Sequence, residues 1–191
     1  MKNGGRLIFL LVFLFTNLSL ANCQYSLPYK KGASYRLLQV WNGKHSHQAP
    51  LEYGLDFDLK VGTPVYAARS GTILKIKNDS KKVGTSKKFI KDANFIHIKH
   101  SDNTFALYAH LKFNGVKVKK GQIIREGELI GYSGNTGFSD SPHLHFEVYR
   151  KDKNQYKRRS LPVTIATQYG PLLGLELGKS YRAVKNDKPC P

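Results

Sequence analysis

Two histidines and a glutamate occupy every second position in the stretch 141–149, which reads SPHLHFEVY. In a β-strand, His143, His145 and Glu147 would share one face, and the apolar residues between them would share the other. The two imidazoles would then lie about 7 Å apart on the same side. That spacing suits one metal-binding histidine beside one that transfers protons. A half-exposed strand that happens to carry histidines would show the same pattern, so other stretches must decide.

Two further stretches carry compatible residues. Asp56 shares a face with Asp58 in the strand expected around GLDFD at 54–58. His110 ends the strand expected over 104–110, and strand parity puts it on the face of Tyr108, as at the rim of a groove. One aspartate and two or three histidines point to zinc, held by three protein ligands with a fourth position open to water.

Short strands and turns account for most of the chain. Strands are expected over 35–40, 72–77, 95–99 and 104–110, the last two forming a hairpin, and a final strand over 161–165. The lysine-rich segment 77–92 is expected to be a loop. There is no pattern of a long amphipathic helix. The sequence therefore predicts an all-β fold in which an antiparallel sheet forms a groove.

Several motifs follow one another in a specific order. They are VGTPVYAA at 61–68, YAHL at 108–111, KGQ at 120–122, GYSGNTG at 131–137 and HLHFE at 143–147. Together they resemble the lysostaphin/LytM-type zinc endopeptidases, which cut peptidoglycan peptides, over about residues 51–149. The resemblance implies that family's duplicated-hybrid-motif fold, a Zn²⁺ cofactor and hydrolysis of peptide crosslinks by metal-activated water.

The resemblance also implies roles for individual residues. His145, the second histidine of His-x-His, matches a zinc ligand, and Asp56 matches the ligand aspartate of the family's His-x-Gly-x-Asp motif. His143 and His110 match the two catalytic histidines. One would take the proton of the water, and the other would stabilise the oxyanion or protonate the leaving amine. The sequence does not assign these two tasks.

The third protein ligand is ambiguous. Glu52 stands where the family motif has its histidine, whereas His47 lies nine residues before Asp56 and could reach the same place if 48–51 loop out. We favour His47, because two neutral histidines and one aspartate leave zinc a net charge of +1, which helps to acidify its water. A second carboxylate would make the site neutral. Glu52 stays open as the alternative.

A different class of function is also open. A degenerate member of the same fold would bind the cell wall or a partner hydrolase and regulate it without cutting. Such proteins lose ligands or catalytic histidines, whereas Asp56, His110, His143 and His145 are all present here. The residues therefore favour an enzyme.

Residues 1–22 read as a signal peptide. Lys2 and Arg6 precede the apolar run 7–15, which is too short for a transmembrane helix. The protein is therefore expected outside the cytoplasm, in the periplasm or cell envelope. The expected parts of the mature chain are an N-terminal extension packing on the domain (23–48), the LytM-type metallopeptidase domain (49–150) and a basic C-terminal extension (151–191).

Cysteines and charge bear on partners. Cys23 and Cys190 could form a disulfide that ties the termini. Residues 20–23 also resemble an imperfect lipoprotein signal, and the sequence slightly favours acylation of Cys23 as a membrane anchor. The net charge of +18 falls to roughly +16 without the signal. With no nucleic-acid motif, the expected partners of this monomer are peptidoglycan peptides and an anionic envelope surface, not nucleic acid.

Overall fold

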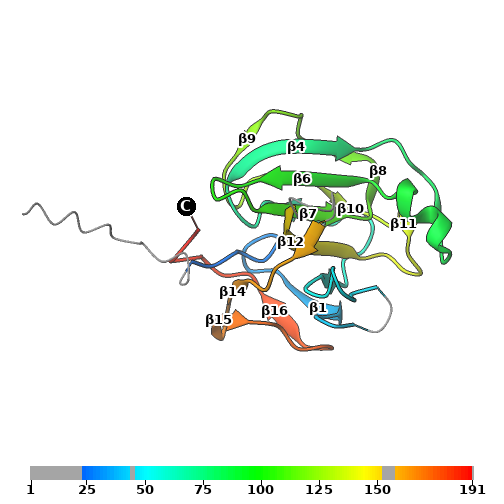
Figure 1. Cartoon of the computed structure of the whole chain (residues 1–191). Helices are drawn as coiled ribbons and strands as arrows, with labels where there is room; N and C mark the ends of the chain where they lie inside the picture. Colours follow the sequence, from blue (N-terminus) through cyan, green and yellow to red (C-terminus); the bar gives the residue numbers. More distant parts are fainter. Residues whose placement is uncertain (1–22, 44–45, 152–157, 191) are drawn as a thin grey trace, which may run out of the picture.

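The computed structural model describes residues 23–43, 46–151 and 158–190 (Figure 1). The predicted signal peptide lies outside these residues. The described chain is nearly all β, and its one named helix is a short 3₁₀ segment, η2 (Lys87–Asp92). Among the described residues, no helix has the length and apolar character needed to cross a membrane.

One large antiparallel sheet organises the molecule. Its strands follow the order β16 (Ser180–Arg182), β1 (Ser34–Gln39), β2 (Leu55–Phe57), β12 (Leu144–Lys151), β7 (Phe105–Ala109), β6 (Phe95–Lys99), β4 (Gly71–Lys77) and β9 (Ile123–Ile124). A further strand, β13 (Arg158–Ser160), pairs with β12 beyond this path. The fold class predicted from the sequence is confirmed.

Smaller sheets complete the fold. Three strands form a second sheet, in the order β3 (Pro64–Tyr66), β10 (Leu129–Ser133) and β8 (Leu111–Val116). Two pairs are separate: β11 (Gly137–Phe138) lies parallel to β5 (Val83–Gly84), and β14 (Thr164–Thr167) lies antiparallel to β15 (Gly170–Leu173).

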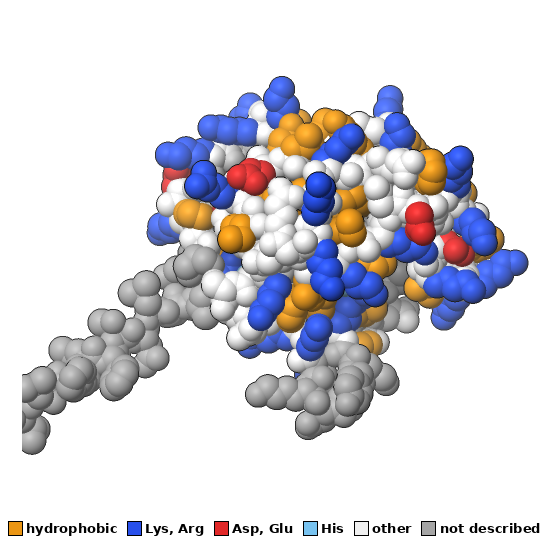
Figure 2. Space-filling view, turned by 90° about the horizontal axis from the view of Figure 1, so that it is seen from above, with side chains coloured by type: hydrophobic (Ala, Val, Ile, Leu, Met, Phe, Trp, Pro, Cys, Tyr) orange, Lys and Arg blue, Asp and Glu red, His pale blue; other side chains and the backbone are white. Residues whose placement is uncertain are grey.

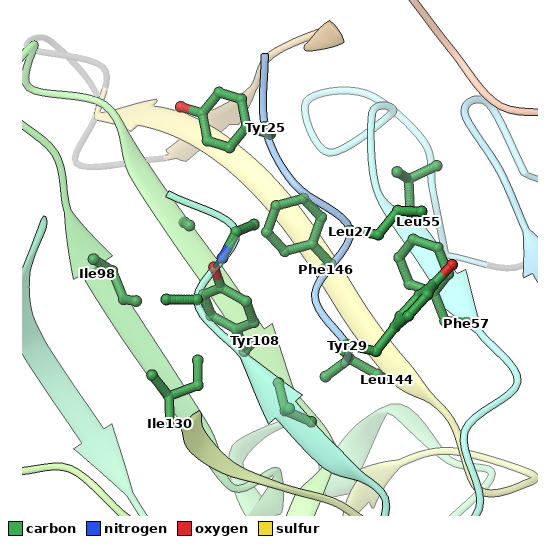
Figure 3. Packing of buried hydrophobic residues seen from close by; sticks show 14 of the residues in the cluster. Tyr25, Leu27, Tyr29, Leu55, Phe57, Ile98, Tyr108, Ile130, Leu144 and Phe146 are labelled. Atoms are coloured by element: carbon green, nitrogen blue, oxygen red, sulfur yellow. Dashed lines mark hydrogen bonds between the residues drawn. The ribbon is translucent and has the colours of Figure 1, made fainter. Parts of the chain in front are cut away.

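The core lies against the inner face of β12. Leu144, Phe146 and Val148 are each at most 1 % exposed and pack with Tyr108 of β7 and Ile130 of β10 (Figure 3). This is the alternation that the sequence predicted for 141–149, with the histidines directed away from the core. β12 therefore joins the core to the functional face.

The segment before β1 belongs to this core. Tyr25, Leu27 and Tyr29 are each at most 4 % exposed, and Leu27 and Tyr29 lie close to Phe57 of β2 in Figure 3. The N-terminal extension expected to pack on the domain thus inserts its side chains into the main cluster of buried residues.

Most predicted strands are present, with three differences. β1, β4, β6 and β7 match the expected ranges within a residue or two. The segment 77–92, expected to be a loop, contains β5 and η2. The strand expected over 161–165 lies further along the chain, as β14. Three more strands of the C-terminal region, β13, β15 and β16, were not predicted, because their residues show little alternation.

The two cysteines form a disulfide. The sulfur atoms of Cys23 and Cys190 are 2.06 Å apart, and a β-bridge joins the neighbouring residues Gln24 and Pro189. The structure therefore favours the disulfide alternative over acylation of Cys23, which the sequence had slightly favoured, because both cannot use the same thiol.

Candidate metal centre and active site

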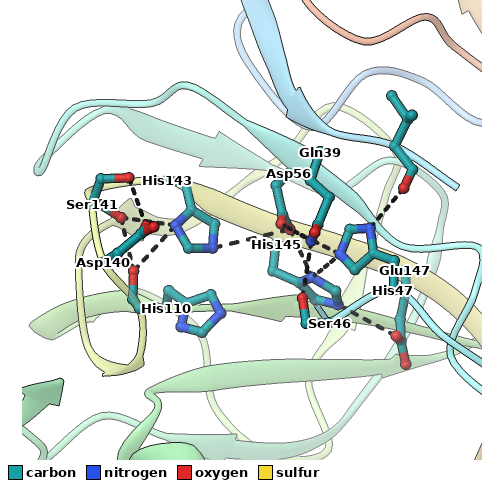
Figure 4. A network of polar contacts seen from close by, with 12 residues as sticks. Gln39, Ser46, His47, Asp56, His110, Asp140, Ser141, His143, His145 and Glu147 are labelled. Atoms are coloured by element: carbon teal, nitrogen blue, oxygen red, sulfur yellow. Dashed lines mark hydrogen bonds and ion pairs between the residues drawn. The ribbon is translucent and has the colours of Figure 1, made fainter. Parts of the chain in front are cut away.

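Three donor atoms converge above the middle of the main sheet. Asp56 on β2 and His145 on β12 are direct partners across the two strands, and His47 reaches them from the loop after β1 (Figure 4). Asp56 Oδ1 lies 2.8 Å from His145 Nδ1 and 3.3 Å from His47 Nε2, and the two ring nitrogens are 3.3 Å apart. These residues form a group that could hold a metal ion.

The spacing of this triangle fits a tetrahedral ion. Zinc bonds of about 2.0–2.1 Å to nitrogen and oxygen keep donor atoms roughly 3.3 Å apart. Two edges of the triangle have that length, and the third is shorter. Two imidazoles and one carboxylate are also the donor types that zinc accepts.

Hydrogen bonds orient both imidazoles. His47 Nδ1 donates to the carbonyl oxygen of Val40 at 3.0 Å, and His145 Nε2 donates to Glu147 Oε2 at 3.3 Å. Each ring therefore directs its other nitrogen at the triangle, where a bound metal ion would replace any proton on it. Gln39 donates from Nε2 to Asp56 Oδ2 at 2.9 Å and leaves Oδ1 directed at the histidines.

The structure brings His47, rather than Glu52, to the other two donors. Glu52 is not part of the group, although its backbone carbonyl accepts a hydrogen bond from Asn42 N–H nearby. Asp58, which the sequence placed on the face of Asp56, is partly exposed and forms an ion pair of 3.4 Å with Arg36.

His110 and His143 lie beside this group. Their ring centres are 4.4 Å apart, and His143 Nε2 is 4.0 Å from Asp56 Oδ1. His110 Nδ1 donates to the carbonyl of Thr136 at 2.7 Å, and His143 Nδ1 donates to that of Ser141 at 2.8 Å. Both rings therefore keep Nε2 free of these backbone bonds, as a proton acceptor requires.

The prediction from strand parity, which placed His110 on the same face as Tyr108, was wrong. Tyr108 is fully buried, and its hydroxyl accepts a hydrogen bond of 2.8 Å from Ala68 N–H, so it points into the core. His110 follows the end of β7 with a φ of 61°, and this left-handed conformation turns its side chain to the opposite face, toward His143. The predicted pairing of Tyr108 with His110 at a groove rim is therefore not found.

The electrostatics of the group follow from burial and proximity. Burial opposes the charge of Asp56, but bonds from His145 and His47 outweigh it and hold its pKa well below the ordinary value. Burial likewise opposes the charge of His145, yet its bonds to Asp56 and Glu147 raise its pKa to about 9. Burial, with the nearby charges of His143 and His145, lowers the pKa of His110 to about 3. His110 is therefore neutral at physiological pH.

Two cavities meet at the group. One, of about 450 Å³, is lined mainly by polar residues, including Asp140, Ser141 and His143. The other, of about 440 Å³, extends over apolar residues that include Ile90, Phe95 and Leu107. His110 and His145 line both cavities, so the convergent side chains lie where the two halves of an open groove join.

The family model described as Peptidase family M23 matches residues 50–157, more than half of the chain. The chain belongs to this family. It is 33 % identical over 153 residues to lysostaphin of Staphylococcus simulans, a match that covers 78 % of this chain and 27 % of lysostaphin. It is 36 % identical over 95 residues to the peptidoglycan DD-endopeptidase ShyA of Vibrio cholerae, covering 50 % of this chain and 19 % of ShyA.

A solved structure supports the same family assignment. A zinc-containing peptidase from Vibrio cholerae superimposes with a TM-score of 0.50 at 25 % identity, over 72 % of this chain and 39 % of that one. The family resemblance drawn from the motifs is confirmed. This M23 chain spans little more than a quarter of lysostaphin and less of ShyA.

Sequence reasoning missed three supporting residues. Gln39 and Arg158 lie outside the segment that the family model matches. Glu147 was placed on the correct face by alternation, but no role was assigned to it. Only the folded chain shows which of these residues touch the ligand group.

Proposed function

We propose that this M23 protein is a zinc-dependent endopeptidase that hydrolyses peptide crosslinks of peptidoglycan. The observation that carries the proposal is the triangle of His47, Asp56 and His145 with His110 and His143 beside it. A module that only binds the wall or regulates a partner hydrolase needs no pair of oriented histidines next to such a group. That regulatory role is the alternative outcome of the test below.

In this proposal His47, Asp56 and His145 hold the zinc ion. When bound there, zinc supplies Lewis acidity, which polarises a carbonyl and lowers the pKa of water. His110 and His143 present Nε2 toward the same space, each held through Nδ1 by a backbone carbonyl. One imidazole accepts the proton of the attacking water, and the other stabilises the oxyanion or protonates the leaving amine. The groove formed by the two cavities holds an extended peptide across these histidines.

The wider setting is part of the proposal. The signal peptide places the monomer outside the cytoplasm, with residues 49–150 as the catalytic domain and the flanking segments as extensions. Figure 2 shows Lys and Arg side chains scattered over one face with few Asp or Glu among them. With a net charge of roughly +16 once the signal peptide is removed, this surface would favour an anionic envelope polymer.

The first test is the zinc content of the purified mature protein and of two variants, His47→Ala and Glu52→Ala. We expect about one zinc per chain in the wild type and in Glu52→Ala, and little in His47→Ala, because removing one of three protein ligands opens the site. Loss of zinc only in Glu52→Ala would instead put the carboxylate in the ligand set.

The activity is then tested by digesting purified peptidoglycan and measuring the new amino groups that hydrolysis of peptide bonds releases. His143→Ala and His110→Ala should keep the zinc but lose a factor of about 10²–10⁴ in rate, as expected when a proton-transfer group is removed. A wild-type protein that binds zinc without digesting peptidoglycan would support the regulatory role.

A further inference from the structure

Arg158 lies directly beyond the segment that matches the family. It opens β13, faces Lys151 across the strand pair with β12, and lines the apolar cavity. Its Nε atom is 2.7 Å from Glu147 Oε1, in an ion pair whose carboxylate side chain has no exposed surface. A buried carboxylate needs such a partner, because burying an unpaired charge is strongly unfavourable.

The same carboxylate contacts a proposed metal ligand. Glu147 Oε2 accepts the Nε2–H of His145 at 3.3 Å, while Nδ1 of that ring faces Asp56 and His47. One oxygen of Glu147 is thus engaged by Arg158 and the other by His145. Rotating the carboxylate would break one contact or both, so Arg158 limits the orientations that Glu147 can offer the imidazole.

We propose that Arg158 is a positioning residue that fixes Glu147, and through it the ring of His145, for metal binding. The inference rests on the proposed function, because it takes the triangle to be a metal site. It adds that a strand outside the family segment helps to set the affinity of that site. Partners of this kind, which orient a ligand without touching the metal, typically contribute 10- to 100-fold in metal affinity.

A purely structural role makes a different prediction. The Arg158 guanidinium also lies 5.9 Å from the centre of the Tyr149 ring, so its removal would loosen packing whatever happens at the metal site. Packing alone would lower the stability of the metal-free protein and leave the zinc dissociation constant of the folded protein unchanged. Metal affinity therefore separates the two roles.

The experiment measures the zinc dissociation constant of the mature protein by competition with a chromophoric chelator. We expect Arg158→Ala to bind zinc 10- to 100-fold more weakly than the wild type, and Arg158→Lys to recover part of the loss by restoring the charge. The matched control is Arg159→Ala, since Arg159 is an exposed arginine on the same strand; its affinity should stay within about twofold. Equal affinities for Arg158→Ala and Arg159→Ala would overturn the inference.

A double variant tests the route through Glu147. If Arg158 acts through that carboxylate, Glu147→Gln with Arg158→Ala should bind zinc as weakly as Glu147→Gln alone. Additive losses would show that Arg158 acts by another route and would overturn the inference. A wild-type protein that binds no zinc would remove the proposed function as well, whereas tight wild-type binding with an unaffected Arg158→Ala removes only the inference.

Discussion

Gly54 lies where two imidazole rings come closest to the backbone. A Cβ atom at this position would lie 2.7 Å from His47 Nε2 and 2.8 Å from His145 Cε1, closer than carbon and nitrogen atoms can approach. We therefore expect Gly54→Ala to push one ring aside and to weaken zinc binding at least about tenfold, measured by chelator competition.

Gly178→Ala is the control. Gly178 is exposed, has a φ of 77° and would meet no atom within 4 Å, so alanine there strains the backbone by about 1–2 kcal/mol without touching the site. Its zinc affinity should match that of the wild type. If both variants bound zinc equally well, the close approach at Gly54 would not govern the site.

Side-chain direction was predictable where the backbone is regular. The period of two placed His143, His145 and Glu147 together because β12 runs without a break through His145 and Glu147, and His143 directly precedes it in a β-bridge to Gly134. It failed at His110, where one left-handed residue reverses the direction of the side chain. The position of His47 could not be derived from spacing, since the loop that carries it has no period.

At the scale of elements, the loop after β10 depends on buried hydrogen bonds. Thr136 Oγ1 accepts Asn94 N–H at 2.9 Å and donates to the Leu111 carbonyl at 2.9 Å, and the Thr136 carbonyl accepts the Nδ1–H of His110. This one residue connects the start of β6, the start of β8 and a proposed catalytic histidine. The orientation of His110 is thus set by two loops and not by β7 alone.

Thr136→Val should therefore lower the free energy of unfolding by about 1–3 kcal/mol, because it leaves the buried Asn94 N–H and Leu111 carbonyl without this partner. Unfolding in urea measures the loss. Thr136→Ser keeps the hydroxyl and should lose clearly less. A serine variant as unstable as the valine variant would assign the effect to the missing methyl group instead.

The strands that bury one face were predictable, and the C-terminal strands were not. β4, β6 and β7 alternate or carry long apolar runs, so their pattern alone identifies them. β13 reads Arg-Arg-Ser and β16 reads Ser-Tyr-Arg, and both are strands only because β12 and β1 offer them backbone partners. Such pairing is a tertiary effect that a local pattern does not contain.

For the whole molecule, segments from both ends complete what the family segment provides. The match covers 50–157, yet Gln39 and His47 come from before it and Arg158 from after it. The N-terminal segment is held by the disulfide and by Tyr25, whose hydroxyl accepts a hydrogen bond of 3.0 Å from buried Arg69. The candidate site thus draws on residues before and after the family segment.

The junction where Tyr25 of the N-terminal segment packs against His100 predicts how stability depends on pH. His100 is 2 % exposed and donates from Nδ1 to the Ser70 carbonyl at 2.8 Å, with the ring of Tyr25 against its edge. Burial chiefly, opposed by the bond to the Ser70 carbonyl and the charge of Asp102 and helped by the charge of Arg69, lowers the pKa of His100 to about 4 from 6.5. Between these two pH values the unfolded chain binds more protons than the folded one.

The free energy of unfolding should therefore fall as pH drops from 6.5 toward 4, with the full contribution of His100 present only above 6.5. The shift corresponds to at most about 3 kcal/mol. Urea unfolding with a metal chelator present, at about pH 7 and about pH 4.5, measures the drop, and His100→Gln should reduce it by a large part of that amount. His97 and His110, whose pKa values burial also lowers to about 4 and about 3, should account for much of the remaining drop. A His100→Gln variant that loses stability as steeply as the wild type would show that the buried imidazole does not set the acid sensitivity of this junction.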